Sequence, residues 1–280
     1  MRFKINVMFK AFIKTTFTRP YIRYLHVVIV LLVTFILLEW QHERNLYQNI
    51  ITANDHNFNP NSDTADARTL MLTISSLMFS RSNLFQDHQR YSLKQQIFQS
   101  SDRDLMYGSG ACGGFSKVLA RTLQLKGYKV RIAQLKTLSY GYGGHTVVEF
   151  YSKSCKSWVM IDPIFHAFFI KANGKWAAVK DLIENWNGYK SQMPEKFKQQ
   201  YRFNGVRYTN WDKLGFLSRG IKAMLNVSTG EKFANTLCLR MYFLATYPIY
   251  IFGSLSVYML LMLNEWRLIY KKQKKHGESA

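Results

Sequence analysis

Two uncharged stretches frame a region of mixed polarity. Residues 24–38 (YLHVVIVLLVTFILL) contain no Asp, Glu, Lys or Arg, and neither do residues 241–263. A helix rises about 1.5 Å per residue, so with its interfacial flanks each stretch is long enough to cross a bilayer. We predict membrane-spanning helices at residues 24–40 and 241–263. The second contains Pro248, which a membrane helix tolerates.

The flanking charges predict the orientation of these spans. Six Lys and Arg precede the first stretch and five lie between residues 264 and 275. By the positive-inside rule both termini are expected in the cytoplasm. The protein is then expected in the cytoplasmic (inner) membrane, with the intervening region periplasmic or otherwise extracytoplasmic. A cleaved signal peptide is the alternative for the first stretch, but Glu39 to His42 offer no small-residue cleavage site, so we expect an uncleaved anchor.

Helical spacing of apolar residues recurs between the spans. Residues 68–80 follow the candidate capping residues Asp63, Thr64 and Asp66, and residues 111–126 end before Gly127. We expect the first of these helices to pack behind the second. Shorter helices are expected at residues 90–99, 181–186 and 216–225, the last as an amphipathic helix near the membrane.

Strand patterns follow the second of these helices. Residues 145–151 (HTVVEFY) and 156–162 (KSWVMID) are rich in β-branched and aromatic residues. We predict a hairpin with its turn at residues 152–155 and His145 directly opposite Asp162. Another strand is expected at residues 128–135, and a second hairpin at residues 166–170 and 175–178 around Ala172-Asn173-Gly174.

Three other stretches lack a clear period. Residues 41–66 are polar and rich in Asn and predict a stalk, with a short helix at residues 46–51. Residues 100–107 predict a loop leading to Cys112. Residues 201–211 (YRFNGVRYTNW) suit either a cleft for a sugar or peptide or, more commonly, the sealing of a core edge.

The expected fold class is α+β, a helix packed on an antiparallel sheet between two membrane spans. The expected organisation is a basic cytoplasmic tail (1–23), the first span (24–40), a stalk (41–66), an extracytoplasmic domain (67–225), a juxtamembrane segment (226–240), the second span (241–263) and a second basic cytoplasmic tail (264–280).

Three residues in the central region carry candidate chemistry. Cys112 follows Gly108-Ser109-Gly110 at the start of a predicted helix, where unpaired N–H groups and the helix dipole favour a thiolate. His145 and Asp162 lie on the two strands of the predicted hairpin. Opposed residues have Cβ atoms about 5 Å apart, close enough for a carboxylate to hold an imidazole. The set suits a nucleophile, its base and a group that orients the base.

Each residue alone has a plainer interpretation. A cysteine in an apolar helix is usually a small core residue, and Asp-Pro commonly ends a strand. The order and pairing of the three favour the triad. A zinc site is the other alternative, but no C-x-x-C or H-x-x-x-H spacing supports it. We therefore expect neither a metal nor a cofactor.

The motifs resemble those of a known family. G-x-C-x-x-F-S-x-x-L-A-R-x-L, then G-H-x-x-V-E and W-x-x-x-D-P, are similar to the transglutaminase-like superfamily, a branch of the papain-like cysteine enzymes, over about residues 65 to 170. The resemblance implies a Cys112, His145, Asp162 triad with the nucleophile on a helix against an antiparallel sheet. Thr146 departs from it, since many members carry an aromatic residue or Ala there.

The resemblance also implies groups that bind the oxyanion and the substrate. The backbone N–H of Cys112 is the first expected oxyanion donor. A second donor comes from upstream of the cysteine in papain-like enzymes, where the candidates are Gln95, Gln96, Gln99 and Tyr107. Residues 139–144 form a glycine-aromatic loop that is either a wall of the substrate cleft or an ordinary strand connection. The substrate-binding candidates are Tyr140, Tyr142, Gly144 and Trp158.

The expected activity is that of a membrane-anchored cysteine peptidase, amidase or acyltransferase acting on an amide or ester through a thioester. Hydrolysis is slightly preferred over crosslinking. The expected substrate is a protein or peptide, free or linked to peptidoglycan or another glycan. The alternative is a non-catalytic binding or assembly module at the envelope, in which the fold is kept for glycan handling.

The chain is strongly basic. The chain carries a formal charge of +21, and residues 41–240 alone hold 27 Lys and Arg and 14 Asp and Glu. A basic domain at a membrane suggests an anionic neighbour such as lipid headgroups or an acidic glycan, unless the lysines only solvate the surface. Nucleic acid is not expected on that side.

The three cysteines form no even disulfide framework; Cys155 lies in the predicted turn and Cys238 is expected to be structural.

Overall fold

The computed structural model describes residues 20–59, 61–85, 100–108, 110–137, 144–193, 198, 203–211 and 216–277. The chain divides into two compact units. One comprises Met1–His42 and Tyr247–Ala280, and the other comprises Glu43–Thr246. The helix expected at residues 90–99 lies outside the described residues.

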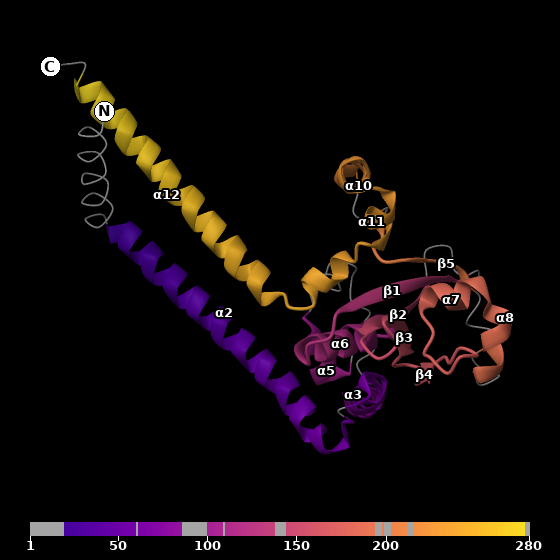
Figure 1. The fold of residues 1–280 in the computed structure, drawn as a ribbon. Coiled ribbons are helices and arrows are strands. Elements are labelled where there is room, and N and C mark those ends of the chain that lie inside the picture. The colour runs from indigo at the N-terminus through magenta and orange to yellow at the C-terminus, as the bar shows by residue number, and fades with distance from the viewer. Residues whose placement is uncertain are drawn as a thin grey trace. The chain divides into compact units, whose positions relative to one another are not determined.

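The first unit contains two long helices, α2 (Pro20–Ala53), which continues into the second unit, and α12 (Tyr247–Gly277) (Figure 1). Both are long and apolar enough to cross a membrane. Val28, Leu31 and Phe35 are each at least 60% exposed, as side chains facing lipid would be. Within this unit the Tyr21 hydroxyl donates to Glu265 Oε2 at 2.9 Å, so the two helices contact each other.

The helix boundaries differ from the expected spans. α2 continues to Ala53 through the residues expected to form a stalk, because Tyr47 and Ile51 bury one helical face in the second unit. The 3₁₀ helix η4 (Leu239–Phe243) occupies the beginning of the expected second span, and α12 starts only at Tyr247. Pro248 therefore lies in the first turn of a helix, where its missing N–H costs no hydrogen bond.

The second unit is built on one antiparallel sheet of five strands in the order β4-β3-β2-β1-β5. The strands are β1 (Val130–Thr137), β2 (Gly144–Ser152), β3 (Ser157–Asp162), β4 (Ala167–Phe168) and β5 (Phe203–Arg207). The other elements of this unit are η1 (Asp55–Asn57), α3 (Asp63–Phe85), α5 (Ser101–Tyr107), α6 (Cys112–Leu125), α7 (Val179–Glu184), α8 (Trp186–Tyr189), η2 (Lys190–Gln192), α10 (Phe216–Thr229) and α11 (Glu231–Thr236). The fold class is α+β, as expected.

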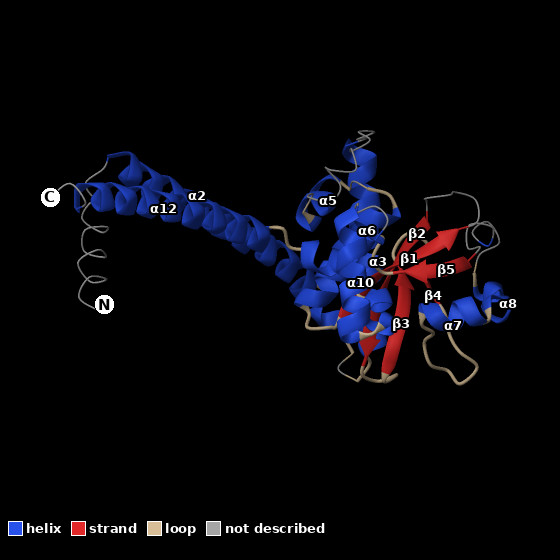
Figure 2. Cartoon of the chain, turned by 90° about the horizontal axis from the view of Figure 1, so that it is seen from above, coloured by secondary structure: helices blue, strands red, loops and turns tan. Residues whose placement is uncertain are grey.

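Helices cover the sheet in two groups. Figure 2 shows α3, α5 and α6 together on one side of the strands and α7 and α8 on the other. α6 packs on β1 and β2, and α3 packs behind α6 and reaches β3. The Phe79 and Phe115 rings join α3 to α6 with centroids 4.8 Å apart. The predicted order of these two helices is confirmed.

The α3 N-terminus corrects one prediction and explains the hairpin turn. Ser62, not Asp63, Thr64 or Asp66, caps the helix by accepting the Ala65 N–H at 3.2 Å. The Asp63 carboxylate is thereby free to bind the turn, where Ser152 Oγ donates to its Oδ1 at 3.0 Å and the Ser154 hydroxyl and Lys153 N–H donate at 2.5 Å. These bonds fix the closed end of the β2–β3 hairpin against α3.

Two segments expected to be irregular are ordered. Residues 101–107 form α5 rather than a loop; Ser101 and Leu105 are buried, and Gly108 ends the helix in the left-handed region at φ 60°. The aromatic stretch after residue 201 contains β5 and then the buried side chains of Tyr208 and Trp211. These two aromatic residues seal a core edge.

Candidate active site

The hairpin brings His145 and Asp162 together, in a register other than the one expected. Tyr151 pairs with Trp158 and Val148 with Ile161, so the partner of Asp162 is Val147 by extension, not His145. The predicted pairing was wrong by two residues because the turn spans residues 153–156, with Lys156 at φ 53°. A shift of two residues preserves the face on which each side chain lies, so His145 and Asp162 still meet diagonally.

Asp162 is fully buried and both of its carboxylate oxygens are engaged. Oδ2 lies 2.5 Å from His145 Nε2. Oδ1 accepts the N–H groups of Ile164 and Phe165 at 2.9 and 3.3 Å, in the turn that follows the strand. The Asp-Pro turn itself is tied to α3, because the Ser75 hydroxyl donates to the Pro163 carbonyl. Asp162 is therefore held rigidly with one oxygen directed at the imidazole.

Cys112 is the first residue of α6. The Ala111 carbonyl accepts the N–H groups of Gly114 and Phe115, so the N–H groups of Cys112 and Gly113 precede the first intrahelical bond. Gly110 has φ 81°, and a Cβ there would lie 3.1 Å from Gly114 Cα. The glycine thus lets the chain turn tightly into the helix.

The Cys112 sulfur hydrogen-bonds His145 and Thr146. Because Nε2 of His145 faces Asp162, Nδ1 is the nitrogen left for the thiol. The backbone N–H and the hydroxyl of Thr146 also donate to the sulfur. Ser116, one turn into α6, donates through its hydroxyl to the Thr146 carbonyl at 2.8 Å and ties the helix to β2 at this point.

These contacts oppose the effect of burial on both titrating groups. Burial alone would raise the pKa of Cys112, but the hydrogen bond and charge of His145 and the two Thr146 donors outweigh it and lower the pKa below 9.0. Burial would lower the pKa of His145, but Asp162 and Cys112 raise it to about 10. The contacts between the two groups therefore favour the charged pair, a thiolate beside an imidazolium, over the neutral pair.

Phe165 completes the wall around the imidazole. Its ring lies against that of His145 with centroids 5.1 Å apart and an interplanar angle of 31°. Sequence reasoning missed both Phe165 and Thr146 as contacts of the site. Thr146 follows the histidine directly, and Phe165 follows Asp162 by three residues, so proximity in sequence to the two motif residues was the available signal.

Of the other eight candidate oxyanion donors and substrate-binding residues, the structure describes Tyr107, Gly144 and Trp158. Gln95, Gln96, Gln99, Tyr140 and Tyr142 lie outside the described residues. Tyr107 ends α5, 41% exposed and near the Arg103 guanidinium. Gly144 pairs with Lys136 beside His145, and a Cβ there would meet the Leu135 carbonyl at 2.2 Å. The structure does not bring Trp158 to Cys112, because its ring packs on Tyr151 and Arg131 near the turn.

The remaining cysteines lie apart from this site. Cys238 is buried, with its thiol donating to the Ile132 carbonyl at 3.3 Å. Cys155 lies in the hairpin turn. All three cysteines are unpaired, and no group of three or more metal-ligating side chains occurs in the described parts of the chain.

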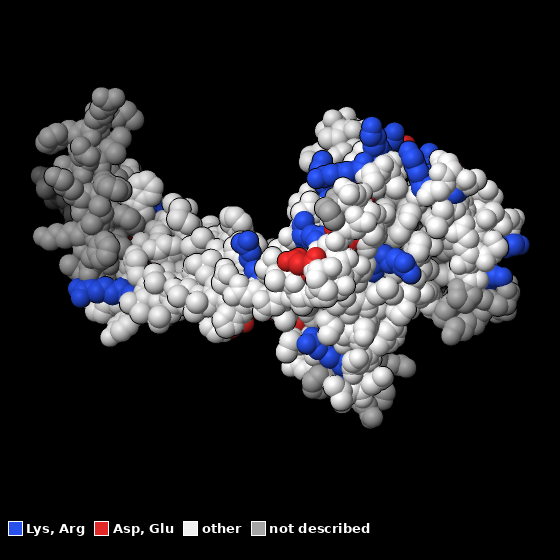
Figure 3. All heavy atoms as spheres, turned by 60° about the horizontal axis from the view of Figure 1, so that its bottom comes forward, with Lys and Arg blue, Asp and Glu red and all other residues white. Residues whose placement is uncertain are grey.

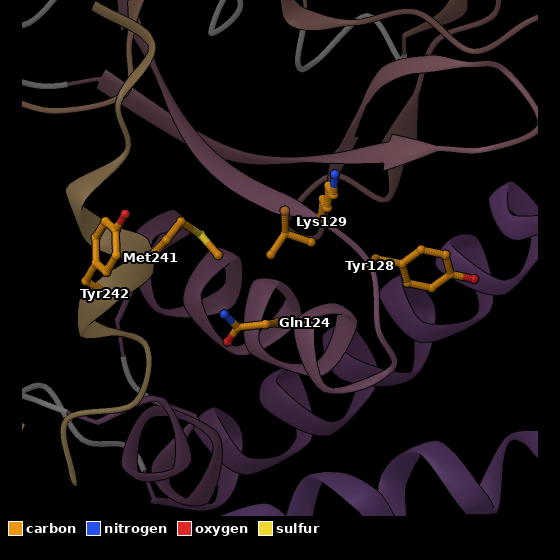
Figure 4. A pocket seen from close by; sticks show the side chains of 6 residues that line it. Gln124, Tyr128, Lys129, Met241 and Tyr242 are labelled. Carbon is orange, nitrogen blue, oxygen red and sulfur yellow. The ribbon is translucent and has the colours of Figure 1, made fainter. Parts of the chain in front are cut away.

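A hollow of about 390 Å³ opens elsewhere in the second unit (Figure 4). It is lined by Gln124, Tyr128, Lys129, Val130, Met241 and Tyr242. Gln124 is twelve residues beyond Cys112 on α6, hence about 18 Å along the helix. The hollow therefore belongs to the opposite end of α6 from the thiol.

No family model, curated protein or solved structure matches this chain.

Proposed function

We propose that the protein is a membrane-anchored, transglutaminase-like cysteine enzyme with a papain-like core, in which Cys112, His145 and Asp162 form the catalytic triad. The observation that supports this is the continuous set of contacts from the Cys112 thiol to His145 and from His145 Nε2 to Asp162 Oδ2. The three side chains come from three elements, and a buried carboxylate held by two backbone N–H groups orients the imidazole.

The proposed reaction begins with attack of the Cys112 thiolate on an amide or ester carbonyl carbon. The bond to the leaving amine or alcohol breaks, and the proton on His145 Nδ1 passes to that group. A thioester on Cys112 remains. The proposed first oxyanion donor is the Cys112 N–H, because the first N–H groups of α6 make no intrahelical hydrogen bond.

The thioester is then cleaved by water in hydrolysis, which we favour, or by an amine in crosslinking. His145 accepts the proton of the attacking group and the thiolate leaves. The imidazolium is thereby regenerated beside Asp162. The acyl group ends as a carboxylic acid or as a new amide.

The proposed location is the cytoplasmic membrane, with α2 and α12 as spans, both termini in the cytoplasm and the sheet domain outside. The two apolar helices and the basic residues beyond them support it. The proposed substrate is a protein or peptide, free or glycan-linked. On the face presented in Figure 3, Lys and Arg outnumber Asp and Glu, which suits an anionic neighbour such as lipid headgroups or an acidic glycan.

The test is to treat the full-length protein in detergent with an activated ester and to measure, by mass spectrometry, the acyl group on the Cys112 peptide. We expect a hydroxylamine-sensitive thioester that is absent in Cys112→Ala and forms far more slowly in His145→Ala. Acylation no faster than that of Cys155, and unchanged by His145→Ala, would contradict the proposal and leave the non-catalytic binding module in its place.

A further inference from the structure

Gln134 lies beside the residues that surround the nucleophile. On β1 it pairs with Thr146 of β2 on one side and with Arg207 of β5 on the other. Directly paired residues point to the same face, with Cβ atoms about 5 Å apart. The Thr146 hydroxyl donates to the Cys112 sulfur, so Gln134 is the next side chain in a row that begins at the nucleophile.

Two guanidinium groups determine the orientation of the Gln134 amide. Arg207 Nε donates to Gln134 Oε1 at 2.9 Å, and a terminal nitrogen of Arg240 in η4 donates to the same oxygen at 3.4 Å. A guanidinium donates hydrogen bonds but accepts none, so the amide oxygen and not the nitrogen must face the arginines. Because Arg207 lies on the β5 side of Gln134, Nε2 is left on the side of β2 and Thr146.

The amide nitrogen is available to a substrate. Within the part of the chain that the structure describes, the side-chain hydrogen bonds of Gln134 are the two that Oε1 accepts, and Nε2 donates to no acceptor. This nitrogen is also not sealed from solvent. The two cations draw electron density towards Oε1, which makes the N–H groups of the amide stronger donors.

One of these cations lies near the sulfur. Burial lowers the pKa of Arg240, and negative charge on Cys238 and Cys112 acts in the opposite direction. The guanidinium that holds Gln134 Oε1 is therefore close enough to Cys112 to be affected by its charge.

The amide and the imidazole approach the nucleophile from different strands. β2 lies between β3 and β1 in the sheet. Asp162 holds the His145 imidazole from the end of β3, whereas Gln134 stands on β1. When the thiolate adds to a carbonyl carbon, the leaving group must face the imidazolium that protonates it. The oxygen is another substituent of the same carbon and faces elsewhere, so a donor on the β1 side suits the oxygen.

We propose that Gln134 is the second oxyanion donor, with Nε2 donating to the substrate oxygen beside the Cys112 N–H. As the S–C bond forms, the electron pair of the carbonyl π bond moves to the oxygen, where the two donors stabilise the charge. The pair returns when the bond to the leaving group breaks. The leaving group takes its proton from His145, so Gln134 loses none.

This inference rests on the proposed function and adds a catalytic residue to it. It places the second donor on β1, downstream of Cys112, whereas the family resemblance implies a donor upstream of the cysteine.

Gln134→Met tests the role on the full-length protein in detergent, because it removes the donor and keeps the length of the side chain. Two reactions of Cys112 are followed by mass spectrometry. Acylation by p-nitrophenyl acetate passes through an oxyanion, whereas alkylation by iodoacetamide displaces iodide without forming one. We expect acylation to slow about 10²-fold. Alkylation should keep the rate of the unmodified protein, because it requires only an accessible thiolate.

Gln134→Glu separates hydrogen-bond donation from the anchoring of the arginines. The glutamate keeps an acceptor for Arg207 and Arg240 but has no N–H to donate. Acylation should slow at least as much as in Gln134→Met, and alkylation of the same sample corrects for any effect of the added charge on the thiolate. The matched control is Gln124→Met, near the other end of α6, where Oε1 likewise accepts from an arginine, Arg121, at 2.8 Å. Both of its rates should be normal.

The two reactions also separate the possible failures. If Cys112 acylates in a His145-dependent way but Gln134→Met acylates as fast as the unmodified protein, the oxyanion role is refuted while the enzyme proposal stands. The same conclusion follows if alkylation slows as much as acylation. Normal acylation in Gln134→Glu would mean that the side chain only holds the arginines, which also refutes the role. If Cys112 acylates no faster than Cys155, the proposed function fails and the oxyanion role fails with it.

Discussion

His145 and Asp162 are joined diagonally across the hairpin, with 2.5 Å between Nε2 and Oδ2, although the backbone register sets them two residues out of direct opposition. The contact therefore depends on the same-face rule of strands and on the turn after β3, which directs the carboxylate. A one-residue slip would have placed the two side chains on opposite faces of the sheet.

Asp162→Asn tests the orientation of the imidazole. The asparagine oxygen would keep the bonds from the Ile164 and Phe165 N–H groups, so its NH₂ would face His145 Nε2. Nε2 would then have to accept, which places the imidazole proton on Nδ1 beside the sulfur and leaves the imidazolium unsupported. We expect acylation of Cys112 to slow on the order of 10³-fold with the fold retained by circular dichroism.

The matched control is Asp55→Asn, which alters an exposed residue of η1. Its acylation rate should equal that of the unmodified protein. An Asp162→Asn protein that acylates at the normal rate would show that Asp162 has only a structural role.

The pH dependence of Cys112 alkylation follows from the two shifted pKa values. The thiol pKa is lowered from 9.0, so the thiolate should persist as pH falls through the region where a free cysteine loses reactivity. His145 has a pKa of about 10, so its positive charge should remain until pH rises past that value. Rates of iodoacetamide alkylation should form a plateau between these limits. His145→Ala should move the lower limit upward, whereas the pH profile of Cys155 should not change.

Thr146→Val removes a hydroxyl donor from the thiolate and nearly preserves shape. We expect the pKa of Cys112 to rise by about one unit, because a hydrogen bond to a charged group contributes about 1.5–3 kcal/mol and part of it is replaced by the remaining backbone donor. The measurement is the pH midpoint of alkylation. Thr146→Ser keeps the hydroxyl and should keep the midpoint, and an unchanged midpoint in Thr146→Val would remove the hydroxyl from the site.

The sequence predicted the elements of the site better than their exact pairing. Helical spacing located residues 111–126, and α6 spans Cys112–Leu125. Their β-branched and aromatic residues located both hairpin strands, in which consecutive residues are buried and polarity does not alternate. The register could not be counted correctly, because it depends on how Asp63 of α3 holds the turn, a contact between residues about 90 positions apart.

Long-range burial also explains the missed helices. Residues 41–53 look like a polar stalk, yet Glu43 is buried with Arg121 of α6, whose Nε lies 2.6 Å from Glu43 Oε1. A buried ion pair leaves no apolar spacing in the sequence from which the helix could be predicted. The hydrogen bond between Arg240 and Gln134 could not be predicted either, because the two residues are 106 positions apart in the sequence.

The membrane topology makes a separate prediction. Basic residues lie beyond both spans, so a reporter fused after residue 280 should be active only in the cytoplasm. Insertion of a reporter into η1, at exposed Asp55, should give activity only outside. A fusion after residue 280 that is active outside would exclude a two-span arrangement with cytoplasmic termini.

Glu149 should be the most stability-sensitive carboxylate of the sheet. It is fully buried on β2 and accepts from Arg131 Nε and the Tyr208 hydroxyl at 2.7 Å and from the Val179 N–H at 3.0 Å. Glu149→Gln keeps the shape but leaves the Arg131 charge without its counter-charge, which costs about 3 kcal/mol for a buried pair. For a unit of roughly 200 residues this lowers Tm by about 6–12 °C.

The control for this prediction is Glu184→Gln, because Glu184 forms an exposed pair with Lys180 on α7 at 3.5 Å. An exposed pair contributes under about 1 kcal/mol, so its Tm should change by no more than a few degrees. Both variants retain Cys112, His145 and Asp162, and alkylation of Cys112 below the transition should be normal in each. Equal Tm values for the two variants would mean that the Arg131 guanidinium finds water or another acceptor when Glu149 is neutralised.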